Sequence, residues 1–222
     1  VLVATIRALK MHGGVDFENL KTENLEALER GFKNLEQHYQ NLRKYDIPVI
    51  VAINHFKDDT ENEIKLLEQL LAKNYYPYAF LDGFLNGGKG SQELATKVLE
   101  VLHTKKSNFH PIYNIEDSIE NKIRTIAKEI YRADDVVFLP EAIEKIKEIK
   151  ALKRDNLPIC MAKTQSSFSD NPSLINTPRD FKITVRDLKL SNGAGFIVAY
   201  CGNILTMPGL PKIPQAVKME DL

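Results

Sequence analysis

The chain has 222 residues, and its thirty lysine and arginine residues balance thirty aspartate and glutamate residues, so its formal net charge is zero. This balance provides no overall field for nucleic acid or an anionic membrane, and any anionic ligand must be held by a local site. With 43% hydrophobic residues, the chain can form a sizeable core as one large domain or two small ones.

No apolar stretch approaches the length of about eighteen residues that a membrane helix needs, and the first residues lack the features of a signal peptide. We therefore expect a soluble, cytoplasmic protein with neither nucleic acid nor a membrane as a partner. Cys160 and Cys201 each lie in an apolar segment. This placement favours buried, reduced thiols over a disulfide or a metal site.

The first half of the chain alternates predicted strands and helices. Residues 1–6 form an apolar run without alternation, which predicts a central parallel strand buried on both faces. Apolar residues then recur at helical spacing over residues 17–45, which predicts one long amphipathic helix. Residues 47–53 read as a second buried strand.

The next helix is expected to start near Thr60, because Thr60 and Glu63 have the spacing of a capping box. A shorter strand in "YPYAFL" and a helix over residues 92–102 follow. This order predicts an α/β fold with a parallel sheet, right-handed crossovers and helices on its faces.

Polar residues and a proline interrupt the alternation of strands and helices over residues 103–114. We place a domain boundary there, between residues 1–103 and 104–222. Beyond it, isoleucines at helical spacing and Pro140 at a first helical position predict two helices. "FKITVRDLKL" and "GFIVAYCG" predict strands, and the prolines of "TMPGLPKIP" favour an extended or turning tail. The second domain is therefore expected to be a smaller α+β domain.

Several stretches resemble formate–tetrahydrofolate ligase, also called formyltetrahydrofolate synthetase. "VATIRALKMHGG" is similar to one of the two signature motifs of the family, and "VIVAINHFKDDTENE", "GGKG", "LPICMAKTQSSFSDNP" and "TMPGLPKIP" continue the resemblance in order. The family polypeptide is longer, and its N-terminal part with the phosphate-binding loop has no counterpart here. No G-x-x-x-x-G-K-[ST] pattern occurs in the sequence. We expect the C-terminal portion of such an enzyme, completing a P-loop-type parallel-sheet domain.

The resemblance implies an ATP-dependent ligation of formate to tetrahydrofolate through formyl phosphate, giving 10-formyltetrahydrofolate. It also implies magnesium, a monovalent cation and a homotetramer. Because the phosphoryl-handling residues would lie on the absent N-terminal portion, in the same or a separate chain, this segment is expected to be inactive alone and to hold no metal. The alternative is a non-catalytic binding or assembly module derived from the same fold.

For folate, the resemblance implies a stacking pair made by Phe56 and Phe84, where the family usually carries tryptophan at the second position. Phe80 occupies a nearby position that is often leucine. Two aromatic faces suit a flat bicyclic ring, although these side chains could instead fill the core. Asn54 follows the strand predicted over residues 47–53. Its side-chain amide could form hydrogen bonds with the edge of a pterin, or it could cap a loop.

Basic residues follow the first predicted strand. Arg7 and Lys10 could contact an anion or nucleotide, or could merely pair with surface carboxylates. His12 is expected to form a structural hydrogen bond beside the turn at Gly13 and Gly14. The acidic residues 58–63 are typical of a helix N-terminus.

The segment that begins at Lys163, Thr164 and Gln165 follows another predicted strand. Its side chains could line a cleft, or the segment could be a solvated loop.

Overall fold

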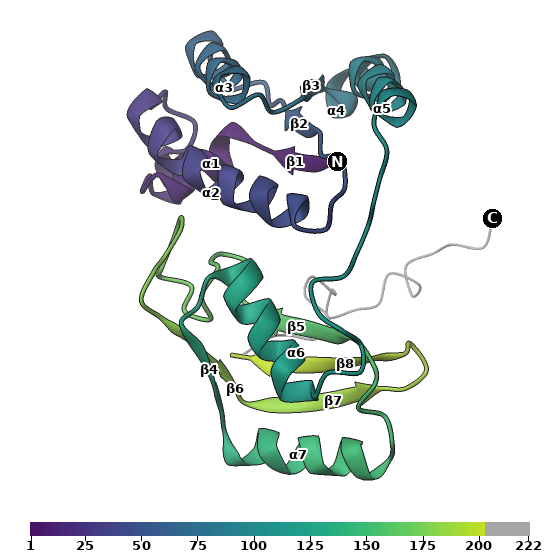
Figure 1. The fold of residues 1–222 in the computed structure, drawn as a ribbon. Helices are drawn as coiled ribbons and strands as arrows, with labels where there is room; N and C mark the ends of the chain where they lie inside the picture. The colour runs from purple at the N-terminus through teal and green to yellow at the C-terminus, as the bar shows by residue number, and fades with distance from the viewer. Residues whose placement is uncertain (203–222) are drawn as a thin grey trace, which may run out of the picture.

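The computed structural model describes residues 1–202, so the expected tail at 206–214 lies outside the described residues. Figure 1 shows a first sheet with its helices, a long connecting segment after α5, and a second group of helices and strands. None of the helices in the described part is long and apolar enough to cross a membrane.

The first sheet is parallel and has the strand order β1-β2-β3. Its strands are β1 (Leu2–Ala4), β2 (Val51–Asn54) and β3 (Tyr78–Leu81). The helices that accompany it are α1 (Ile6–His12), α2 (Leu25–Arg43), α3 (Glu61–Lys73), α4 (Gly83–Asn86) and α5 (Gln92–Thr104). The parallel α/β arrangement predicted for this half is thus confirmed.

The predicted start of the chain needs correction. β1 is an edge strand of the described sheet, and Val1 and Val3 are exposed instead of buried. The strand stops because Thr5 caps α1, its hydroxyl accepting a hydrogen bond from the Ala8 amide at 3.1 Å. Ile6, expected at the end of the strand, is the first residue of this helix.

Capping also divides the helix predicted over residues 17–45. A single 3-10 turn forms at Phe17–Asn19, and α2 begins only at Leu25. The Asn24 side chain accepts from the Ala27 amide at 2.9 Å and so fixes this start. The strand expected over 47–53 begins later, at Val51, which is the residue paired with Leu2 of β1.

α1 and α2 touch through their backbones. A Cβ atom on Gly31 would lie 1.8 Å from the carbonyl oxygen of Leu9, and one on Gly13 would lie 1.9 Å from that of Ala27. Neither distance is sterically possible, so both positions require glycine. The neighbouring Gly14 has φ +94° and requires glycine for its backbone conformation instead.

The second group contains α6 (Ile119–Ile126), a π-helical turn (Ala127–Tyr131) and α7 (Pro140–Ala151), with Pro140 in the first turn as predicted. Its strands are β4 (Asp135–Phe138), β5 (Ile159–Lys163), β6 (Lys182–Val185), β7 (Asp187–Ser191) and β8 (Phe196–Cys201). β4 pairs with β6, while β5, β8 and β7 form a mixed sheet.

Two expectations for this part were wrong. The single strand predicted in "FKITVRDLKL" is divided at Arg186, because β6 pairs with β4 whereas β7 pairs with β8. Cys201 is buried as expected, but Cys160 is exposed. Neighbouring side chains of a strand point to opposite faces, and Cys160 lies on the open face of β5.

Each group has its own hydrophobic core, one around Leu28, Ile53 and Leu67, the other around Ile123 and Ile183. Polar contacts connect them. The side-chain amide of Asn34 donates to the carbonyl oxygen of Asn176 at 2.8 Å, and the side-chain amide of Asn41 donates to the carbonyl oxygen of Ile130 at 2.7 Å. The proposed domain boundary after residue 103 stays a prediction.

Candidate functional site

The strands β2 and β3 end side by side at the carboxyl edge of the first sheet. Asn54 is paired with Leu81, and the His55 amide donates to the Leu81 carbonyl oxygen at 3.0 Å. Phe56 lies two residues beyond Asn54, and Phe84 lies three residues beyond Leu81, in α4. The segments carrying the two aromatic side chains therefore leave the same edge of the sheet, where open α/β sheets bind ligands.

Phe84 is 92% exposed, which contradicts the alternative that it fills the core. The backbone around it is well fixed. The Asp82 amide donates to the Gly90 carbonyl oxygen at 2.9 Å, and a Cβ atom on Gly90 would lie 2.1 Å from the Asp82 carbonyl oxygen. The side-chain amide of Asn86 donates to the Asp82 carboxylate at 2.6 Å. An ordered turn thus presents a large apolar ring to solvent.

Phe56 is half-buried, and the guanidinium carbon of Arg7 lies 4.4 Å from its ring centroid. Arg7 Nη2 also pairs with Asp58 Oδ2 at 2.8 Å. The Asp59 carboxylate accepts from the Phe56 amide at 2.8 Å; burial raises the pKa of Asp59, and this hydrogen bond opposes the increase. One face of the Phe56 ring therefore carries a cation held by a carboxylate.

Phe80 packs against the first core, and its amide donates to Glu93 Oε1 at 3.0 Å. Asn54 is half-buried at the end of β2. These positions bring Asn54 to the edge that carries Phe56 and Phe84, while Phe80 has the contacts of a packing residue. The folate role suggested for each stays a prediction.

Lys10 lies in a different environment. Its ammonium donates to Glu63 Oε1 at 2.7 Å and to the Thr22 carbonyl oxygen at 3.0 Å, and the side chains of Lys10 and Glu63 are 1% and 0% exposed. Burial raises the pKa of Glu63, but the hydrogen bonds from Lys10 and from the Asn24 and Thr60 amides outweigh it and lower the pKa overall. Pairing with a surface carboxylate is thus wrong for Lys10, because its partner is buried. Arg7 does pair with a surface carboxylate; a contact with an anion stays a prediction for both.

The segment after Lys163 folds around the Lys163 ammonium. This group donates to the carbonyl oxygens of Thr164 at 3.0 Å, Ser169 at 3.2 Å and Ser167. Both serines are buried, so the solvated-loop interpretation is wrong for them. Burial lowers the pKa of Lys163 to about 8.

His12 accepts a hydrogen bond at Nδ1 from the Asn176 amide at 3.1 Å, which confirms its structural role. Sequence reasoning missed Asn176, which also donates through its side chain to the Arg30 carbonyl oxygen at 3.0 Å. Asn176 has φ +64°, a conformation that asparagine tolerates better than most residues. In the sequence, only an asparagine two residues before a proline, in "INTP", indicates a turn at this position, and this signal is weak.

No group of three or more histidine, cysteine, aspartate or glutamate side chains is placed to hold a metal ion among residues 1–202. The sequence profile described as Formate--tetrahydrofolate ligase matches residues 1–221. This match covers both cores and includes the segments that carry Arg7, Phe56 and Phe84. The chain belongs to the formate–tetrahydrofolate ligase family, whose members are carbon–nitrogen ligases acting on formate, tetrahydrofolate and ATP.

Proposed function

We propose that this chain supplies the folate-binding part of an ATP-dependent ligase that makes 10-formyltetrahydrofolate. In this reaction the terminal phosphoryl group of ATP passes to a formate oxygen, which gives ADP and formyl phosphate. An amine nitrogen of tetrahydrofolate then attacks the formyl carbon, the bond to the phosphate oxygen breaks, and the nitrogen loses its proton. The protein must mainly align the pterin with the formyl carbon and exclude water.

The ATP-handling groups of this reaction would lie in an N-terminal portion, in the same or a separate chain. The absence of a G-x-x-x-x-G-K-[ST] pattern from the sequence supports this division. Because residues 1–202 gather no such group of metal ligands, magnesium and a monovalent cation would be held by that N-terminal portion. The isolated segment is inactive in this proposal, and the complete enzyme is a cytoplasmic homotetramer.

The pterin ring would lie between the Phe84 ring and the face of Phe56 that Arg7 leaves free. The exposure of Phe84 carries this assignment, because a phenylalanine that is 92% exposed on an ordered turn contributes little to the core. Stacking on an aromatic ring adds about 0.5–1.5 kcal/mol beyond burial of area. Arg7 and Asp58 would border the same space and favour a polar edge of the ligand.

Titration of the 222-residue chain with tetrahydrofolate, followed by isothermal calorimetry, tests the assignment. Replacing Phe84→Ala should weaken folate binding by about 1–3 kcal/mol, the usual cost of losing one stacking aromatic side chain. Phe84→Trp should preserve or tighten binding, because the larger ring keeps the stacking contact.

Tyr75→Ala is the matched control, since Tyr75 is 91% exposed but precedes β3, at the opposite end of that strand from Phe84. Its folate affinity should equal that of the unchanged chain. Circular dichroism verifies that each variant is folded. Equal folate affinity in the Phe84→Ala variant and the unchanged chain would exclude Phe84 from the pterin site.

A further inference from the structure

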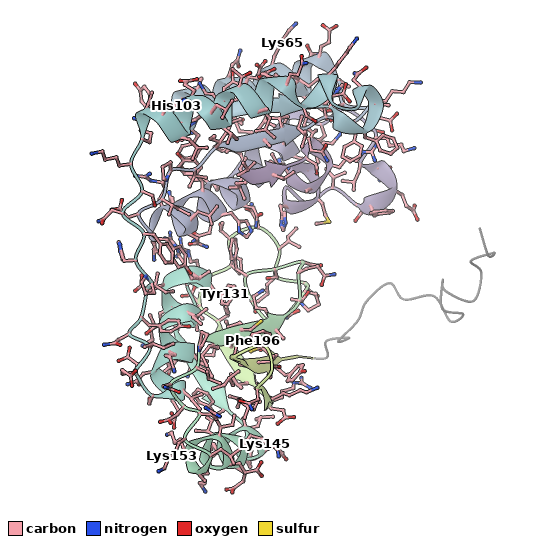
Figure 2. All side chains as sticks on the ribbon, turned by 90° about the vertical axis from the view of Figure 1, so that its right-hand side faces the viewer. Lys65, His103, Tyr131, Lys145, Lys153 and Phe196 are labelled. Carbon is pink, nitrogen blue, oxygen red and sulfur yellow. The ribbon has the colours of Figure 1, made fainter. Side chains whose placement is uncertain are left out.

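A cavity of about 210 Å³ lies between the helices α1 and α2 and the segment after β5. Its polar lining comes from both groups of elements and includes Asn34 and Ser167 as well as His12, His38, Tyr131, Lys163, Thr164 and Gln165. Tyr131, labelled in Figure 2, lies on the part of the second group that faces the first. Neither the folate-stacking pair nor Arg7 contributes to this lining.

The lining is rich in hydrogen-bond donors. Because His12 Nδ1 accepts from the Asn176 amide, the proton of the neutral ring is assigned to Nε2. The Thr164 hydroxyl oxygen accepts from the Ser166 amide at 3.2 Å, which leaves the hydroxyl proton free to donate. Burial raises the pKa of Tyr131 to about 12, so its phenol also keeps its proton.

The cavity also concentrates basic groups. Burial, followed by the charges of His12 and Lys163, lowers the pKa of His38 to about 4. Burial lowers the pKa of His12 as well. The Phe168 ring, with its centroid 4.5 Å from that of His38, restricts the His38 imidazole. Among the described residues, no aspartate or glutamate lines this cavity.

Lys163 contributes charge and not a direct contact. Its ammonium is already bound to three carbonyl oxygens, and it lies 4.8 Å from the Tyr131 ring centroid. Asp170, which raises the pKa of Lys163, is the carboxylate that acts on this group, although it lies outside the lining. A ligand would therefore meet the charge of Lys163 together with proton-bearing groups of two imidazoles, a hydroxyl and a phenol.

We propose that this cavity binds a small oxyanion, either inorganic phosphate or a carboxylate. Oxyanion oxygens accept hydrogen bonds without donating any, which matches a lining of donors without carboxylates. Because the lining comes from α1 and α2 on one side and from β5 and its following segment on the other, the bound anion joins the two groups of elements. This site is separate from the folate platform, so either proposal can fail without the other.

Histidine NMR of the 222-residue chain provides a direct test. Sodium phosphate and sodium acetate are added in separate titrations, with sodium chloride at equal ionic strength as the control. One oxyanion or both should shift the His12 and His38 resonances saturably and raise the pKa of His38 toward its ordinary value, because an anion stabilises the protonated ring. The oxyanion that saturates at the lower concentration identifies the preferred class.

The chain contains its own reference signal, because His103 is exposed near the end of α5, far from Tyr131 in Figure 2. Its resonance should follow ionic strength only. His38→Gln should weaken the saturable shift of His12 at least tenfold, whereas Lys65→Gln, at an exposed position of α3, should not change it. Shifts of His12 and His38 that are no larger with phosphate or acetate than with chloride would overturn the proposal.

Discussion

Two ion pairs connect the short helix α1 to residues 58–63, yet they lie in opposite environments. The Arg7 and Asp58 side chains are 31% and 40% exposed, whereas those of Lys10 and Glu63 are almost completely buried. Arg7 and Lys10 are less than one helical turn apart. Burial, and not residue type or motif membership, therefore separates a charge that supports the fold from one that can contact a ligand.

Removing the buried carboxylate should have the largest effect. Glu63→Gln leaves the Lys10 ammonium buried without a negative partner, so we expect the free energy of unfolding to fall by about 3–5 kcal/mol. Urea unfolding followed by circular dichroism measures it. Glu61→Gln, an exposed position in the same first turn of α3, is the control and should change little. Equal stability of the two variants would remove the distinction between the two ion pairs.

Acid should weaken the same pair. The pKa of Glu63 is lower in the folded chain than its ordinary value of 4.5, so its contribution to stability is complete above that value. It is lost as the pH falls through the lower, folded-state pKa, where the carboxylate takes up a proton. Urea midpoints measured between neutral and acidic pH should therefore decline, and the decline should be smaller in the Glu63→Gln variant. Identical pH profiles for the two proteins would contradict this assignment.

The exposed pair should contribute much less. Asp58→Asn should lower the free energy of unfolding by only about 0.2–1 kcal/mol, because water and salt screen the attraction. The difference should shrink further at high salt, whereas the cost of Glu63→Gln should persist. A loss for Asp58→Asn comparable with that for Glu63→Gln would show that exposure does not rank these two pairs.

The smallest change in stability is expected for the aromatic platform. Phe84→Ala should alter the free energy of unfolding by less than about 0.5 kcal/mol, as is usual for an exposed side chain. Phe32→Ala, at a buried position of α2, should cost about 3–5 kcal/mol. Thermal melts of both variants measure the contrast, and a large loss for Phe84→Ala would restore the core interpretation.

The sequence predicted what depends on near neighbours. The capping box of Thr60 and Glu63 forms as expected, because both its hydrogen bonds join residues three apart. Glu63 nevertheless also binds Lys10, which is 53 residues away, and no local pattern reveals that contact. The spacing of residues around a helix start therefore predicted the cap and missed the buried ion pair.

Strand pairing shows the same limit. β4 has only four residues, and its partner β6 lies more than forty residues later, so nothing near β4 identified it as a strand. For the site, family resemblance selected Phe56 and Phe84, but the sequence could not distinguish an exposed ring from a buried one. Exposure depends on the turn that Asp82 and Gly90 fix, which only the structure describes.

The backbone contact between α1 and α2 has a mechanical consequence. Because Gly13 and Gly31 leave no space for even one added carbon atom, the backbones of the two helices resist sliding past each other. Arg7 lies near one end of α1, and His12, at the other end, is about 7.5 Å away along the axis. Only a ligand that moves the α1 backbone itself, and not merely the Arg7 side chain, would therefore move His12 and the α2 wall of the cavity with it.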